Sequence, residues 1–196
     1  MDWRERYERA AARYEAGETR ELDERQLVQL ANAAWAAGLS LLMEGDRDGA
    51  AKWLRRSASR YRESWRAGSD SWGRQIGVLK ALLIAGDDPS DAARWTLDAD
   101  AVHAESPIGR YAGVLALLVL GRDAEAGALV ATLADSFPSN VAAALAALAV
   151  GDAEAYDVGI ASVRNSFEAR EDFLEDMPVA DTALALDALA RTRGVV

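Results

Sequence analysis

The chain contains no cysteine, which excludes structural disulfides and metal sites built from thiolates. Long apolar runs are also missing: the longest, from Tyr111 to Leu120, covers about half of the ~20 residues that a membrane-spanning helix needs. The N-terminal segment alternates charged and aromatic residues and lacks the apolar stretch of a secretory signal. These absences predict a cytoplasmic protein that has no membrane partner.

Lysine is scarce, with only Lys52 and Lys80, and the net charge is −10. Nucleic acid is therefore not an expected partner, because phosphate binding requires a basic face that releases counterions. The charges are unevenly placed. Residues 52–66 form a basic stretch rich in arginine, whereas residues 96–105 and 168–176 are acidic.

Hydrophobic residues make up 51% of the 196 residues, enough to bury a core. Alanine, leucine, glutamate and arginine dominate, and β-branched residues do not alternate as they do in strands. This pattern predicts an all-α fold. The expected helices cover residues 2–16, 20–44, 47–67, 70–85, 89–102, 107–120, 123–135, 139–150, 153–174 and 179–192.

A recurring turn supports this assignment. Gly45, Gly86, Gly121 and Gly151 each follow an apolar helix end; an aspartate comes next in three of them, and Arg122 separates Gly121 from Asp123. A glycine just past a helix end adopts positive φ without strain, and the aspartate can accept hydrogen bonds from the first N–H groups of the next helix. Turns this short favour adjacent antiparallel helices. The four turns predict stacked helix pairs.

The first of these turns resembles the inter-helix turn of the tetratricopeptide (TPR) family. Leu42, Gly45 and Asp46 match its apolar, glycine and aspartate positions, and Ala50 or Ala51 matches its alanine. The other turns carry insertions or shifts, at intervals that bracket the roughly 34-residue TPR period. The resemblance implies an irregular right-handed α-α superhelix of antiparallel helix pairs.

Because no long linker divides the chain, we expect a single helical-repeat domain over residues 1–196. Within it, residues 1–17 form a charged N-terminal helix and residues 20–170 form the helix-pair repeats. Residues 179–194 form a C-terminal capping helix.

Two acidic groupings offer chemistry. His103, the only histidine, has Asp98, Asp100 and Glu105 near it and suggests an oxygen-rich metal site or a base held by a carboxylate. A surface or helix-end role is the stronger interpretation of a single histidine. The carboxylates between Glu168 and Asp176 have the spacing of bundle metal ligands but lack the accompanying histidines, so a solvated acidic face is favoured. With no phosphate loop or nucleophile elbow, catalysis and cofactors are not expected.

The six tryptophans all lie in the first half of the chain, where arginines of the basic stretch flank several of them. Buried packing explains most large aromatic residues. The alternative is a groove that anchors an acidic or aromatic peptide, because tryptophan and arginine are enriched in binding hot spots. Exposure is most expected for Trp65 and Trp72. The candidate interaction surface consists of Trp53, Arg55, Arg56, Arg62, Trp65, Arg66 and Trp72.

The last third has a second resemblance. A Gly151-Asp152 turn precedes Tyr156 and a long helix, and a leucine- and alanine-rich helix ends at Arg193-Gly194. This order is similar to the C-terminal layout of the immunity protein 49 family, all-helical proteins of bacterial polymorphic-toxin systems. The resemblance implies a protein that binds and blocks another protein.

Three functional hypotheses remain. The first is a non-catalytic protein-interaction or scaffold protein with a protein or peptide partner. The second is an immunity-type protein that neutralises a toxin. The third is a metal-binding protein or enzyme that uses Asp98, Asp100, His103 and Glu105.

Overall fold

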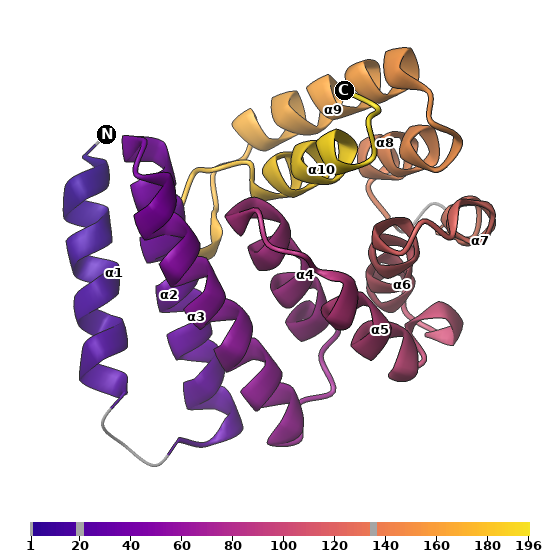
Figure 1. Cartoon of the computed structure of the whole chain (residues 1–196). Coiled ribbons are helices and arrows are strands. Elements are labelled where there is room, and N and C mark those ends of the chain that lie inside the picture. Colours follow the sequence, from indigo (N-terminus) through magenta and orange to yellow (C-terminus); the bar gives the residue numbers. More distant parts are fainter. Residues whose placement is uncertain (1, 19–21, 134–136) are drawn as a thin grey trace. The chain divides into compact units, whose positions relative to one another are not determined.

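The computed structural model describes residues 2–18, 22–133 and 137–196, which are all-helical and contain no strand (Figure 1). These residues form ten α-helices and two short 3₁₀ helices: α1 Trp3–Gly17, α2 Glu24–Glu44, α3 Arg47–Arg66, α4 Gly73–Ala85, α5 Ser90–Asp98, η1 Ala101–His103, α6 Pro107–Val119, α7 Asp123–Val130, α8 Ser139–Val150, α9 Ala153–Glu168, η2 Leu174–Asp176 and α10 Asp181–Thr192. The predicted all-α class is confirmed.

The chain divides into two compact units. Unit 1 comprises Met1–Asp87 and Glu171–Val179, and unit 2 comprises Asp88–Arg170 and Ala180–Val196. Within unit 1, α1 packs on α2, α2 on α3 and α3 on α4; within unit 2, α5 through α10 likewise pack on their neighbours in sequence. The sequence pattern predicts one repeat domain over residues 1–196 and does not predict two units.

The glycine turns have the backbone conformation that the sequence predicts. Gly45, Gly86, Gly121 and Gly151 have φ of 89°, 77°, 69° and 68°. After each glycine, the next N–H donates to a carbonyl five residues earlier, as from Asp46 to Leu41 at 2.9 Å. Free carbonyls at the helix end thereby gain a partner, which stabilises the stop.

The aspartates beside these glycines act in different ways. Asp46 and Asp152 cap the next helix, accepting hydrogen bonds from the N–H groups of Gly49 at 2.9 Å and Ala155 at 3.0 Å. Asp123 instead accepts a hydrogen bond from Arg193 at 2.6 Å. The predicted capping role is therefore confirmed at two of the four turns.

Three of the turns join helices that pack on each other: α2 with α3, α6 with α7, and α8 with α9. At the remaining turn, the boundary between the units falls at Asp87, directly after Gly86. This turn therefore connects two units instead of closing a helix pair within one.

Several predicted helix ends are wrong. The fifth helix stops at Asp98, four residues early, because Asp100 adopts a left-handed conformation with φ of 64°. The ninth stops at Glu168, whereas the prediction extends it to residue 174. Asp23 caps α2 through a 2.8 Å bond from the N–H of Gln26, so α2 begins at Glu24. Residues 20, 21, 134 and 135 of the predicted helices lie outside the described residues.

Each unit has a helix that is buried along most of its length. In unit 1 it is α2, whose residues 33–41 are all buried. In unit 2 it is α6, buried from Tyr111 to Leu118. Among the described residues, no helix combines the length and the apolar character needed to cross a membrane.

Candidate interaction site

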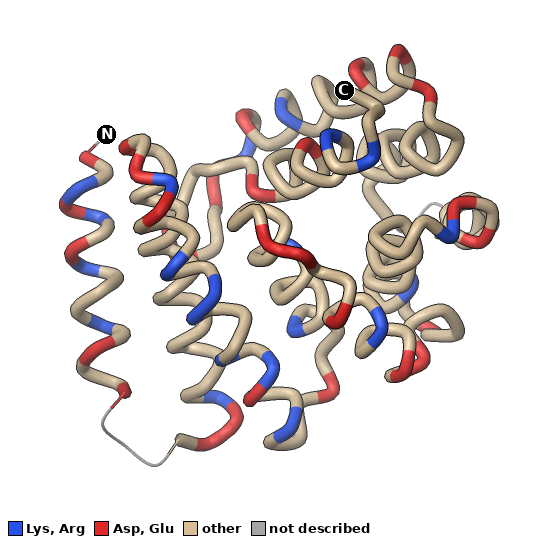
Figure 2. Tube along the Cα trace, viewed as in Figure 1, with Lys and Arg blue, Asp and Glu red and all other residues tan. Residues whose placement is uncertain are grey.

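The first helix presents a row of arginines. Arg6, Arg9 and Arg13 are spaced by three and four residues, which places them on one side of α1. The helix begins where Asp2 accepts a 3.0 Å hydrogen bond from the N–H of Glu5. Figure 2 shows positive and negative residues interspersed along α1. The helix therefore carries partners for acidic groups on its surface.

Residues 171–179, here called the acidic strap, lie against this row within unit 1. The guanidinium of Arg13 pairs with the carboxylate of Glu175, and the guanidinium of Arg6 donates to the carbonyl of Asp176. η2, which is part of the strap, also contacts α2 (Figure 1). The strap is thus held by the first two helices, which are more than a hundred residues away in sequence.

The strap is anchored by apolar contacts as well as by charge. Met177 is 4% exposed, and its sulfur lies 4.0 Å from the hydroxyl of Ser40 on α2. The side chain of Glu175 is 17% exposed, although its neighbours Glu171 and Asp172 are exposed. The segment therefore inserts the Glu175 carboxylate and the apolar side chains of Met177 and Val179, and leaves other acids in solvent.

Two adjoining cavities mark a groove between α1, α2 and the strap. The larger, of about 410 Å³, is lined by Gln26, Gln29 and Leu30 of α2; the smaller, of about 140 Å³, by Arg6 and Arg9 of α1. Arg13 and Glu175 line both. We call this region the α1–α2 groove. Its guanidinium and amide groups can bind carboxylates and backbone carbonyls, and its aliphatic residues can bury short apolar side chains.

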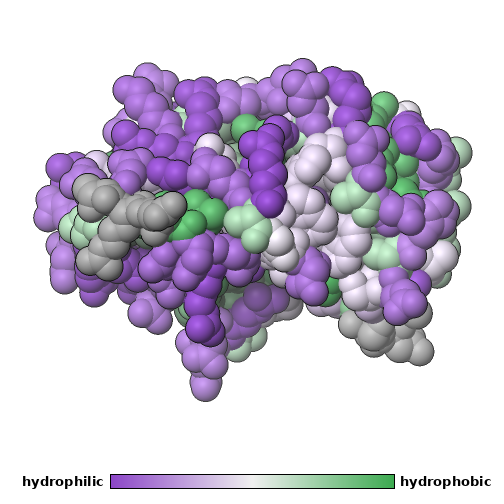
Figure 3. Space-filling view, turned by 90° about the horizontal axis from the view of Figure 1, so that it is seen from below, coloured by the Kyte–Doolittle hydropathy of each residue, from purple (hydrophilic) through white to green (hydrophobic). Residues whose placement is uncertain are grey.

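The surface in Figure 3 is mainly hydrophilic, with apolar residues in small separate areas. Such a face does not present one large apolar patch for docking.

The predicted tryptophan and arginine surface is divided among several contacts. Trp53 is 6% exposed and packs edge-to-face on Tyr14 at 5.3 Å between ring centroids. The guanidinium of Arg56 covers the Trp53 ring at 4.5 Å. These residues hold α3 against α1, so Trp53 belongs to the core and is not part of an open groove.

The remaining arginines of this surface have separate positions. Arg55 forms two 2.7 Å hydrogen bonds with the carboxylate of Asp87, which raises the pKa of the guanidinium. Arg62 is half-buried and Arg66 is exposed. The basic stretch of residues 52–66 thus pairs in part with acids of its own unit.

Trp65 and Trp72 form the other aromatic contact, with ring centroids 5.7 Å apart across the α3–α4 turn. Both are partly exposed, which matches the expectation for this pair.

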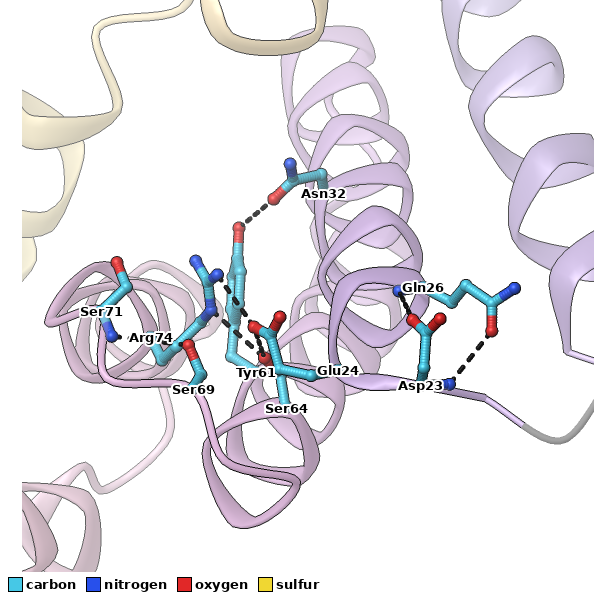
Figure 4. Close-up of polar contacts among 9 residues, drawn as sticks. All are labelled: Asp23, Glu24, Gln26, Asn32, Tyr61, Ser64, Ser69, Ser71 and Arg74. Atoms are coloured by element: carbon cyan, nitrogen blue, oxygen red, sulfur yellow. Dashed lines mark hydrogen bonds and ion pairs between the residues drawn. The ribbon is translucent and has the colours of Figure 1, made fainter.

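A polar network lies near the same turn (Figure 4). The hydroxyl of Ser64 donates to Glu24 at 2.9 Å, and Arg74 donates to both, at 3.2 Å to each. The hydrogen bond from Ser64, followed by that from Arg74, lowers the pKa of Glu24. Through these hydrogen bonds the hydroxyl of Ser64 connects α2, α3 and α4. Ser64 is fully buried, so its hydroxyl is not open to a substrate.

The histidine cluster does not assemble into a ligand set. Nδ1 of His103 lies 2.5 Å from a carboxylate oxygen of Asp100, and both side chains are more than 70% exposed. Across the residues described, no three His, Asp or Glu side chains are grouped so that they could hold a metal ion.

Most of the acidic residues 168–176 are solvated, as the sequence favours: Glu168, Glu171, Asp172 and Asp176 are exposed. Only Glu168 belongs to α9, and the others follow it in non-helical chain or in η2. Positive φ at Glu175 and Asp176, of 59° and 53°, turns the chain so that Glu175 meets Arg13. Glu175 is therefore the partly buried exception, and the helical spacing of these carboxylates is not realised.

A further hollow of about 710 Å³ lies on α8 and α9. Its polar residues already serve the fold: Asp152 caps α9, and the amide of Asn140 donates to the carbonyl of Ser162 at 3.1 Å. None of the described residues that line it is cationic. The α1–α2 groove consequently offers more recognition chemistry.

Arg6, Arg9 and Arg13 are functional candidates that the sequence alone does not single out. The sequence does contain two signals, namely the arginine spacing on the charged first helix and the acidic run before Pro178. It does not show that these two segments pair with each other, because 162 residues separate Arg13 from Glu175.

The fold and the groove define a coarse class, an all-helical protein built from helices that pack on their sequence neighbours. Compared with known proteins, the chain matches no protein-family model, no curated protein sequence and no solved structure.

Proposed function

We propose that this chain is a non-catalytic protein-interaction protein of the helical-repeat kind, whose partner is a protein or peptide. The observation that carries the proposal is the α1–α2 groove, which already holds a stretch of polypeptide without α-helix, residues 171–179, through charge and buried apolar side chains. A peptide segment bound in this way is recognised through both its backbone and its side chains.

The packing of successive helices also supports a TPR-like arrangement. Pairs such as α2 with α3 and α8 with α9 pack on each other and are joined by short turns whose glycines have positive φ. We extend the proposal to an irregular α-α superhelix, in which stacked pairs expose helix faces to a partner.

The proposal is tested by affinity purification of the tagged protein from its source cells, followed by binding of the purified partner in isothermal titration calorimetry. A specific protein partner with a defined stoichiometry is expected. An unrelated acidic protein, tagged in the same way, serves as the control. The proposal is rejected if every recovered protein also binds this control, or if the purified candidates do not bind the chain.

An immunity-type role is the second candidate. Its favouring observation is that Gly151, Asp152 and Tyr156, which carry the resemblance, organise the α9–α10 pair: Asp152 caps α9, and the hydroxyl of Tyr156 donates to Asp187 at 2.9 Å. Co-expression with each toxin-like protein encoded beside its gene should restore growth. If none of these proteins is toxic, or the chain protects against none, this candidate is rejected.

A further inference from the structure

The acidic strap occupies the groove as a bound peptide would. Its Glu175 carboxylate meets Arg13, and Met177 is inserted two residues later. Glu175 and Asp176 hold positive φ, a conformation that side chains disfavour and that persists only where the surroundings fix it. The contacts to Arg6 and Arg13 therefore maintain a segment that has little tendency to adopt this shape alone.

The strap also has features that favour its release from the groove. It joins α9 to α10 and includes no α-helix of its own. Its ion pair is partly open to solvent, since the Arg13 side chain is 54% exposed. Exposed ion pairs contribute little to stability and weaken with salt. A competing acidic segment can therefore replace this ion pair, and to displace the strap it must also bury an apolar side chain where Met177 lies.

We propose that the α1–α2 groove is a binding site for a short acidic segment of a partner protein, and that residues 171–179 are its internal occupant, which the partner displaces. This inference rests on the proposed interaction function and names the chemistry of its partner. The matching segment carries a carboxylate followed two residues later by an apolar side chain, the spacing of Glu175 and Met177.

The probe is a fluorescein-labelled peptide with the sequence of residues 168–180. In the whole protein, the strap competes with the probe at an effective concentration in the millimolar range, as short connections give. The variant Glu175→Gln/Met177→Ala weakens the strap and should bind the probe at least tenfold more tightly than the wild type, measured by fluorescence anisotropy.

Charge reversal at the groove supplies the specificity control. In the weakened variant, adding Arg13→Glu should reduce probe affinity at least tenfold. A probe carrying arginine in place of Glu175 should restore binding to that protein. Adding Arg4→Glu instead, the same change on the same helix where the arginine pairs with Glu8 at 3.1 Å, should leave affinity within twofold.

The proposal is overturned if the weakened variant binds the probe no better than the wild type does, or if Arg13→Glu and Arg4→Glu have equal effects. If the weakened variant fails to fold, hydrogen exchange on the wild type tests the proposal instead. Millimolar probe should accelerate exchange in residues 171–179, whereas a scrambled peptide should not. Equal exchange with the two peptides refutes displacement. If a purified partner binds Arg13→Glu as well as wild type, the groove assignment fails while the interaction function stands.

Discussion

Tyr156 is a polar residue in the core of unit 2, 1% exposed and hydrogen-bonded through its hydroxyl to Asp187. Burial, followed by the hydrogen bond to Asp187, raises the pKa of this phenol above its ordinary value of 10.0. The unfolded chain therefore loses this proton at lower pH than the folded chain does. Stability from Tyr156 is complete below pH 10 and is lost as the pH rises beyond it.

Tyr156→Phe should lower the free energy of unfolding at pH 7 by about 1 kcal/mol, because one hydrogen bond is lost and Asp187 retains Arg164. Above pH 10 the free energy of unfolding should fall less steeply with pH in the variant than in the wild type. The difference in slope is at most that produced by one titrating proton. Urea denaturation at intervals between pH 7 and 11.5 measures both effects. Parallel alkaline slopes for the two proteins would contradict the assignment.

Residue type alone left several roles undecided. The tryptophans were assigned either to a core or to a groove, and the structure places Trp53 in the core under Arg56 while Trp65 and Trp72 remain partly exposed. The difference depends on which helix lies opposite each ring. A sequence pattern marks the face of a helix but does not name the neighbour that covers it.

At the scale of elements, close helix packing gives two helical glycines opposite roles. A Cβ on Gly159 of α9 would lie 3.0 Å from the backbone nitrogen and Cα of Ala144 on α8. A Cβ on Gly127 of α7 would lie 3.7 Å from the Cβ of Ala149, an ordinary contact. Alanine is the better helix former, so only the space available distinguishes the two sites.

Gly159→Ala should lower the free energy of unfolding by about 1–3 kcal/mol, because α8 and α9 must move apart. Gly127→Ala serves as the matched control and should raise it by about 0.5–1 kcal/mol through helix propensity. Chemical denaturation monitored by circular dichroism measures both. Similar effects of the two substitutions would show that the helices are not in such close contact.

The helix assignments of the sequence analysis succeed where local signals act. Asp46 and Asp152 cap helices, and glycines end them, because these interactions join residues close in sequence. The assignments fail between residues 169 and 174. There the composition suits a helix, but long-range contacts with α1 hold the chain in another conformation.

At the scale of the whole molecule, the two units each have their own core, and Arg193 ties together several parts of unit 2. Its side chain, 15% exposed, donates to the carbonyls of Leu118 at 2.6 Å and Leu148 at 3.4 Å and to the carboxylate of Asp123 at 2.6 Å. The positive charge lies at the C-terminal ends of α6 and α8, which the helix dipoles favour.

Arg193→Ala should lower the free energy of unfolding of unit 2 by about 2–4 kcal/mol, since charged hydrogen bonds to partly buried groups are lost. Hydrogen exchange should accelerate in α6, α8 and α10 and much less in α1 to α3 of unit 1. Arg191→Ala, an exposed arginine at the same helix end, is the control and should change little. Equal acceleration in both units would refute independent cores.

The sequence by itself determined the all-helical class, ten helices close to their observed places, and the glycine turns between them. These features follow from hydrogen bonds and backbone preferences within a few residues. Only the tertiary structure decided that one boundary between the units falls after Asp87, that Trp53 is buried, and that the acidic run leaves its helix to pair with the first one. Such outcomes depend on contacts between residues far apart in sequence, whose pairing emerges only when all helices bury their apolar faces together.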